Sequence, residues 1–154
     1  MFFFKHGSLS RRMAVAKIMG MTVGVLGGLL VAPYLLGEVS AFFRWGIFAW
    51  HLTLGGIVGI FGVVTECPHF GKHCPFHKNK KFRPFLRGAL AGAWLNFVIT
   101  LVAFESISEM FLFAENIPVE LGNPLIWIPI VGAVIGGIVD IVATRYGGEG
   151  KEIL

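Results

Sequence analysis

Hydrophobic positions in this chain form long unbroken runs rather than the three- and four-residue spacing of a helix with one wet face. Four runs carry no charged side chain when His51 is counted as neutral: Ile18–Leu36, Trp45–Thr65, Gly88–Phe104 and Leu121–Val139, with 19, 21, 17 and 19 residues. A helix needs about 20 apolar residues to cross the hydrocarbon core of a bilayer, and about 17 is the lower limit. The pattern therefore predicts four transmembrane helices, because a soluble bundle would need a polar outer face on each helix.

Prolines and capping residues place the ends of the predicted helices. We expect helices over approximately residues 14–37, 42–65, 84–114 and 123–146, with a loop over 66–83. Asn123-Pro124 is typical of an N-cap followed by the first helical position. The third helix is extended to 114 because no proline interrupts the chain between Pro84 and Pro118. The first apolar run exceeds the about 7–15 residues of a signal-peptide core, so we expect it to be retained.

Composition supports the same class of protein. Apolar residues make up 55% of the 154 residues and charged residues only 14%, whereas soluble domains carry about 25% charged residues. This length predicts one domain, here covering residues 1–154. The sequence thus indicates an all-α integral membrane protein built as a four-transmembrane-helix bundle, with the lipid bilayer as its first partner.

Basic residues gather on one side of the predicted bundle. Twelve of the 13 lysines and arginines lie before the first span, between the second and third, or after the fourth, and Arg44 alone lies on the other side. Positive charge marks the cytoplasmic side of a membrane protein. We therefore expect both termini to be cytoplasmic, in a bacterial or archaeal plasma membrane or an organellar inner membrane. Because topology accounts for the net charge of +4, the sequence gives no reason to expect a nucleic-acid partner.

Glycines four residues apart mark the predicted contact faces of the helices. Each predicted span carries this spacing, through Gly20, Gly24 and Gly28, through Gly55 and Gly59, through Gly88 and Gly92, and through Gly132 and Gly136. Small residues at this spacing let membrane helices approach closely. The spacing leaves open whether the partner helix belongs to the same chain or to another subunit. GGIVGI (Gly55–Ile60) also recurs as GGIVDI (Gly136–Ile141), either by coincidence among glycine-rich helices or as the trace of a duplicated hairpin.

Three polar side chains within the predicted spans are candidates for a functional or structural role. They are His51, Asn96 and Asp140. Polar groups in a membrane interior mark either a substrate path or an interhelical hydrogen bond. The first interpretation makes His51 and Asn96 part of a proton or substrate route with Asp140 at its inner mouth. The second predicts a His51–Asn96 hydrogen bond and pairs Asp140 with Arg145 or Arg87.

The stretch CPHFGKHCPFHK, Cys67–Lys78, holds both cysteines and three of the five histidines. Its possible metal ligands are Cys67, His69, His73, Cys74 and His77. Zinc binds four nitrogen or sulfur ligands in a tetrahedron, but the spacing here is irregular. The two Cys-Pro pairs also resemble the short motif whose thiolate binds ferric haem. Zinc, another transition metal and haem remain candidate cofactors, and the alternative is a basic turn that contacts anionic lipid.

Three functional hypotheses follow from these features. The first is a non-enzymatic accessory or scaffold subunit of a larger membrane assembly, because the sequence shows glycine-rich helix faces and no motif for a nucleophile or phosphate-binding loop. Its partners would be other membrane subunits or further copies of the chain. The second is a small channel or transporter that uses His51, Asn96 and Asp140. The third is a metal- or haem-responsive membrane protein that uses the segment Cys67–His77.

Overall fold

The computed structural model describes residues 4–36, 40–62, 82–103, 105, 107 and 123–150. These residues are helical apart from short connections, and none of them forms a strand. Within these residues, three helical segments are long and apolar enough to cross a membrane: Leu9–Tyr34, Arg83–Val102 and Pro124–Gly147. The chain is therefore all-helical over the described residues, as a multi-pass membrane protein would be.

The first hairpin pairs α1 with α3. α1 (Leu9–Leu26) continues through a π-helical turn, η1 (Gly27–Val31), into α2 (Ala32–Leu36), and α3 (Ala41–Phe61) returns along α1. Serines begin both helices: Ser8 Oγ accepts a hydrogen bond from the Arg11 amide at 3.3 Å, and Ser40 Oγ accepts one from the Phe43 amide at 3.2 Å. Such caps satisfy backbone donors that the first turn leaves free.

The second hairpin pairs α5 (Arg83–Val102) with α7 (Pro124–Gly147). The predicted cap of the last helix is confirmed, because the Leu125 amide donates to Asn123 Oδ1 at 3.1 Å and Pro124 begins the helix. α5 ends at Val102, and most of its predicted extension to residue 114 lies outside the described residues.

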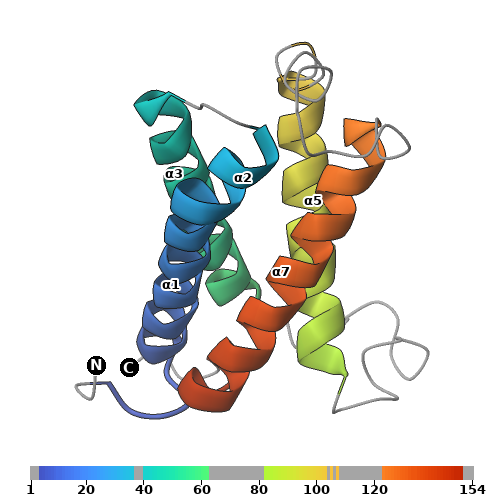
Figure 1. Cartoon of the computed structure of the whole chain (residues 1–154). Coiled ribbons are helices and arrows are strands. Elements are labelled where there is room, and N and C mark those ends of the chain that lie inside the picture. Colours follow the sequence, from blue (N-terminus) through green and yellow to red (C-terminus); the bar gives the residue numbers. More distant parts are fainter. Residues whose placement is uncertain are drawn as a thin grey trace.

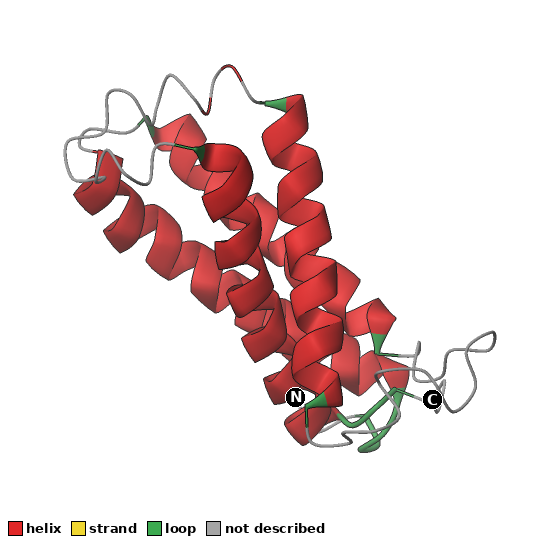
Figure 2. Cartoon of the chain, turned by 90° about the vertical axis from the view of Figure 1, so that its right-hand side faces the viewer, coloured by secondary structure: helices red, strands yellow, loops and turns green. Residues whose placement is uncertain are grey.

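The two hairpins lie side by side, and their helices alternate in direction (Figures 1 and 2). α7 leans across the bundle so that its last turn meets the start of α1, where the Gly7 amide donates to the Gly147 carbonyl oxygen at 2.9 Å. We call this end, where α1 and α5 begin and α3 and α7 finish, the basic end. The end where α3 and α7 begin is the opposite end.

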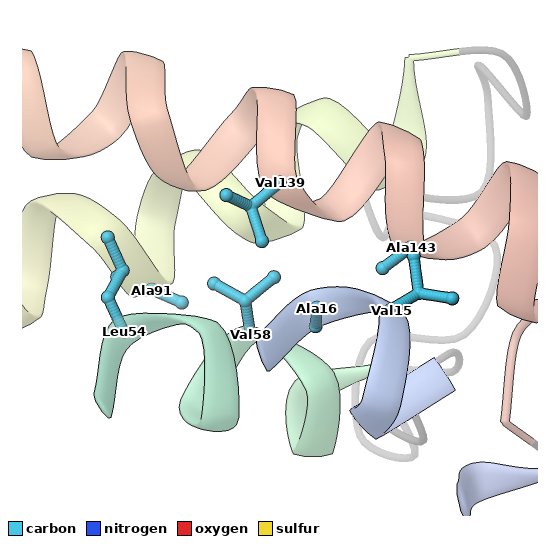
Figure 3. Packing of buried hydrophobic residues seen from close by; sticks show 7 residues of the cluster. All are labelled: Val15, Ala16, Leu54, Val58, Ala91, Val139 and Ala143. Atoms are coloured by element: carbon cyan, nitrogen blue, oxygen red, sulfur yellow. The ribbon is translucent and has the colours of Figure 1, made fainter. Parts of the chain in front are cut away.

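Small side chains fill the interior and large apolar side chains cover the outside. The buried cluster contains Val15, Ala16, Leu54, Val58, Ala91, Val139 and Ala143 (Figure 3). In contrast, Leu30, Trp94 and Val102 are 63%, 69% and 83% exposed. Lipid solvates apolar side chains as well as the protein interior does, so close contact selects small residues inside a membrane bundle.

The nine glycines of the predicted contact faces lie against neighbouring helices of the same chain. Within the first hairpin, a Cβ atom added at Gly20 would overlap the carbonyl oxygen of His51, and one at Gly55 would overlap that of Ala16. The other glycines are placed similarly: Gly24, Gly28 and Gly59 in the first hairpin, and Gly88, Gly92, Gly132 and Gly136 in the second. The structure thus places these faces at intramolecular helix crossings.

Candidate functional site

A buried group of charged and polar side chains joins the helices at the basic end. Arg12 and Asp140 are 0% exposed, and Arg87 is 5% exposed. Thr144 lies one turn after Asp140 on α7 and bonds to all three. We call these four residues the Arg–Asp cluster.

Asp140 is the acceptor at the centre of the Arg–Asp cluster. Arg87 binds it through two nitrogens, with Nε donating to Oδ2 at 2.8 Å and Nη2 donating to Oδ1 at 3.0 Å. Arg12 Nη2 also donates to Oδ1, and the Thr144 hydroxyl donates to the same oxygen at 3.2 Å. The fork of a guanidinium matches a carboxylate in this bidentate geometry. A single carboxylate therefore orients two arginines from different helices.

Two guanidiniums and one carboxylate leave one positive charge in excess, and backbone carbonyl groups face it. Arg12 Nε donates to the Gly59 oxygen at 3.0 Å and Nη1 donates to the Gly148 oxygen at 2.9 Å. Arg87 Nη1 donates to the Gly62 oxygen at 3.0 Å. Gly59 lies in the last turn of α3, and Gly62 and Gly148 are the C-cap residues of α3 and α7. All three carbonyls therefore lie at the negative end of a helix dipole. The two helix ends thus stabilise the second arginine.

Gly62 lets the Arg12 guanidinium reach the end of α3. A Cβ atom at position 62 would overlap the Nε, Cζ and Cδ atoms of Arg12. Any larger residue would therefore push the guanidinium away from its acceptors. Glycine is required here for space rather than for backbone conformation, because its φ is −56°.

The Arg–Asp cluster receives at least one group from each of the four long helices or its cap. α1 supplies Arg12, α5 supplies Arg87, α7 supplies Asp140 and Thr144, and the end of α3 supplies carbonyl oxygens. Among the described residues, the one buried side-chain polar atom without a hydrogen-bond partner lies elsewhere, on Arg44. The cluster is therefore a closed network that holds the helices together.

One of the two expected partners of Asp140 is present and the other is not. Arg87 binds it as described, whereas Arg145 is exposed and lies over the ring of Tyr146, with its Cζ 5.9 Å from the ring centroid. Arg12 precedes the first predicted span, and its sequence position alone predicts no role inside the bundle. The missed signal was spacing, because Arg12 lies four residues before Ala16 and eight before Gly20. It therefore continues the contact face of α1.

The predicted hydrogen bond between His51 and Asn96 is wrong. His51 is half-buried, and its Nδ1 lies 2.8 Å from the carbonyl oxygen of Ile47 one turn earlier. Asn96 is buried and accepts a bond from Trp50 Nε1 at 3.1 Å, while its amide nitrogen donates to the Gly92 oxygen at 2.9 Å. A polar link between α3 and α5 does exist in the interior, but the indole of Trp50 makes it.

The predicted metal or haem ligands lie outside the described residues. They are Cys67, His69, His73, Cys74 and His77. Within the described part of the chain, no three histidine, cysteine or carboxylate side chains gather closely enough to hold a metal ion. A cofactor site in that loop stays a prediction.

Over the described residues, the chain is a helical protein with helices long and apolar enough to cross a membrane. The buried ion pairs of the Arg–Asp cluster join these helices at the basic end. Comparison of the chain with family models, with curated proteins and with solved structures finds no match.

Proposed function

We propose that this chain is a four-span membrane protein with both ends on the cytoplasmic side, acting as a non-enzymatic accessory or scaffold subunit of a larger membrane assembly. α3 is the fourth span in this proposal. It has 21 residues and packs along α1, which is itself long and apolar enough to cross a membrane. Arg44 and His51 lower its hydropathy, and Arg44 lies in the first turns, near the interface where long basic side chains reach water.

The observation that carries the proposal is the closed Arg–Asp cluster. Its bonds link α1 to α3 and α7, and α5 to α7 and the end of α3. Breaking such a buried pair leaves an uncompensated charge, so the helices at the basic end are expected to move as one body. A rigid bundle suits a subunit that positions its neighbours better than one that must alternate between two open states.

Partner contacts in this proposal use the outer faces of the bundle. The glycine faces are already occupied within the chain, whereas Trp45, Trp94 and Val102 are 68%, 69% and 83% exposed. Large rigid aromatic side chains contribute strongly to interfaces. Either a second copy of the chain or another membrane subunit would satisfy this arrangement.

Isolation without complete delipidation tests the accessory role. The tagged full-length chain would be expressed at low level in a homologous host and extracted into polymer-bounded lipid discs. Native mass spectrometry is expected to find a defined complex, and Trp94→Ala is expected to weaken it more than Thr22→Ala, a substitution at another exposed position of the helical surface. Recovery of the chain only as a monomer would contradict the proposal.

Transport is the second candidate function, and the buried Asp140 favours it. Ionisable groups inside a membrane protein often mark the route of an ion, and half-buried His51 lies farther along the bundle on α3. Proteoliposomes would be tested for proton or anion flux with His51→Ala and Asp140→Asn. Flux that is present in the wild type and unchanged in both folded variants would exclude a route through these residues.

A further inference from the structure

A hollow of about 330 Å³ lies between the α1–η1 segment and α3, toward the opposite end of the bundle. Its walls include Gly24, Val25, Gly28 and Leu29 on one side and Trp45 and Phe48 on the other. Trp45 and Phe48 meet edge to face, with ring centroids 5.7 Å apart. The lining is apolar except for one charged side chain, Arg44. We call this hollow the Arg44 groove.

Glycine spacing and a π-helical turn shape the Arg44 groove. Gly24 and Gly28 bring the backbones together, since an added Cβ would lie 2.9 Å from the Phe48 Cα and 3.0 Å from the Arg44 oxygen, respectively. Without side chains at these positions, the space beside the crossing stays open. η1 (Gly27–Val31) includes the lining residues Gly28 and Leu29, and π-helical turns occur frequently at functional sites. The groove is therefore a built feature of the first hairpin.

Arg44 is half-buried and is the one charged side chain that lines this hollow. Its Nε is buried and has no hydrogen-bond partner among the described residues. A buried donor without an acceptor is unfavourable, and a charged one more so. An anionic group bound to the Arg44 guanidinium would supply an acceptor that the described residues lack. Since the other lining residues are apolar, the complementary molecule has a negative head and a hydrocarbon body.

We propose that the Arg44 groove binds a phospholipid, with the lipid phosphate on the Arg44 guanidinium and an acyl chain along Val25 and Leu29. A guanidinium matches a phosphate through two parallel hydrogen bonds. Arg44 lies one turn inside the start of α3, near the depth of lipid headgroups when α3 spans the bilayer. Exposed Trp45 beside it fits the aromatic belt at membrane interfaces. The inference depends on α3 as a membrane helix but not on the accessory role.

Lipid titration of the full-length protein in mild detergent, followed by native mass spectrometry, tests this proposal. Phosphatidylglycerol is expected to bind with one molecule per chain, whereas diacylglycerol with the same chains is expected not to. Excess inorganic phosphate is expected not to displace the lipid. Arg44→Gln is expected to weaken binding at least about tenfold, because it removes charge-assisted hydrogen bonds. Arg145→Gln, which removes an exposed charge at the other end of the bundle, is the matched control.

A second variant keeps the charge and fills the hollow. Val25 is 41% exposed, so Val25→Trp adds bulk to the groove without entering a tight core, and it is expected to reduce lipid binding while thermal unfolding stays close to that of the wild type. Equal binding by the wild type, Arg44→Gln and Val25→Trp would overturn the proposal. Equal loss in Arg145→Gln, or tight binding of diacylglycerol, would overturn it as well. Saturable binding of inorganic phosphate that excludes the lipid would reassign the groove to a soluble anion.

Discussion

At the residue scale, the hydrogen-bond donors around Asp140 offset the free-energy cost of burying its charged carboxylate in an apolar bundle. Arg12, Arg87 and Thr144 all bond to its carboxylate. Helix-end carbonyls then balance the remaining positive charge. Removing a single member is therefore expected to affect the rest, because each charged group is the partner of another.

Replacing Asp140 with asparagine is expected to destabilise the bundle by about 3–5 kcal/mol, because two buried guanidiniums lose their counter-charge. Unfolding in mixed micelles with rising SDS would measure the change. Arg145→Gln is the control, since Arg145 is exposed and lies outside the Arg–Asp cluster, and exposed charged side chains contribute about 1 kcal/mol or less. Similar losses in both variants would refute the central role of Asp140.

The interior bond from Trp50 to Asn96 is expected to contribute much less. Trp50→Phe keeps an aromatic ring and removes the indole donor, so a loss of roughly 0.6 kcal/mol, the average for hydrogen bonds between membrane helices, is expected. A double-mutant cycle with Asn96→Ala in the same unfolding assay would isolate the bond. A coupling energy as large as the effect of Asp140→Asn would contradict this ranking of the two polar sites.

At the element scale, each hairpin is held by backbone contact at its glycines. Gly88 and Gly92 of α5 lie against Gly136 and Gly132 of α7, so closely that a Cβ added at Gly88, Gly92 or Gly136 would overlap a carbonyl oxygen of the facing glycine. A Cβ at Gly132 would overlap the side chain of Asn96. Such approach favours dispersion contacts along the whole crossing. The two helices can therefore approach this closely only because these four positions carry no side chains.

Gly92→Ala is expected to destabilise the second hairpin by about 1–3 kcal/mol, as overpacking does. Gly46→Ala is the matched control, because no atom lies within 4 Å of a Cβ at that position and alanine favours a helix. SDS unfolding of the two variants would compare them directly. An equal effect at both positions would mean that helix propensity, rather than contact, decides the outcome.

The sequence predicted these elements through features that act locally, and it failed where the outcome depended on three-dimensional neighbours. Charge-free runs and the Asn123 cap located helices because hydropathy and capping are properties of adjacent residues. Arg12 was missed because a basic residue beside an apolar run ordinarily marks topology. Its role depends on a contact between distant parts of the chain, the last turn of α7 and the start of α1. The choice of Trp50 over His51 as the partner of Asn96 likewise depends on helix rotation.

At the scale of the whole molecule, the two hairpins place two segments of nearly identical sequence in corresponding positions. The segments GGIVGI and GGIVDI lie on α3 and α7, each the returning helix of its hairpin. Val58 and Val139, at the same position of each segment, meet in the core (Figure 3). The next residue is Gly59 in one and Asp140 in the other, and Arg12 bonds to both.

The proposed four-span topology predicts opposite accessibility at the two ends of the bundle. In a background with Cys67→Ser and Cys74→Ser, Ser40→Cys is expected to react with an impermeant maleimide added outside intact cells. Glu149→Cys is expected to react only after the membrane is opened, because it lies at the basic end. Labelling of both from outside, or of neither, would contradict a crossing by α3.

The long sequence separation between the bonded residues of the Arg–Asp cluster also has a consequence for biosynthesis. Arg12 and Asp140 are 128 positions apart, so ribosomes must make almost every helix before the carboxylate emerges. Until then the nascent chain presents two arginines at helix contact faces with no acid to neutralise them. A chain whose synthesis stops before α7 would therefore leave these two arginines unpaired, and membrane proteases and chaperones can recognise such unpaired charges. Packing of α7 would then complete the bundle and bury both arginines against Asp140.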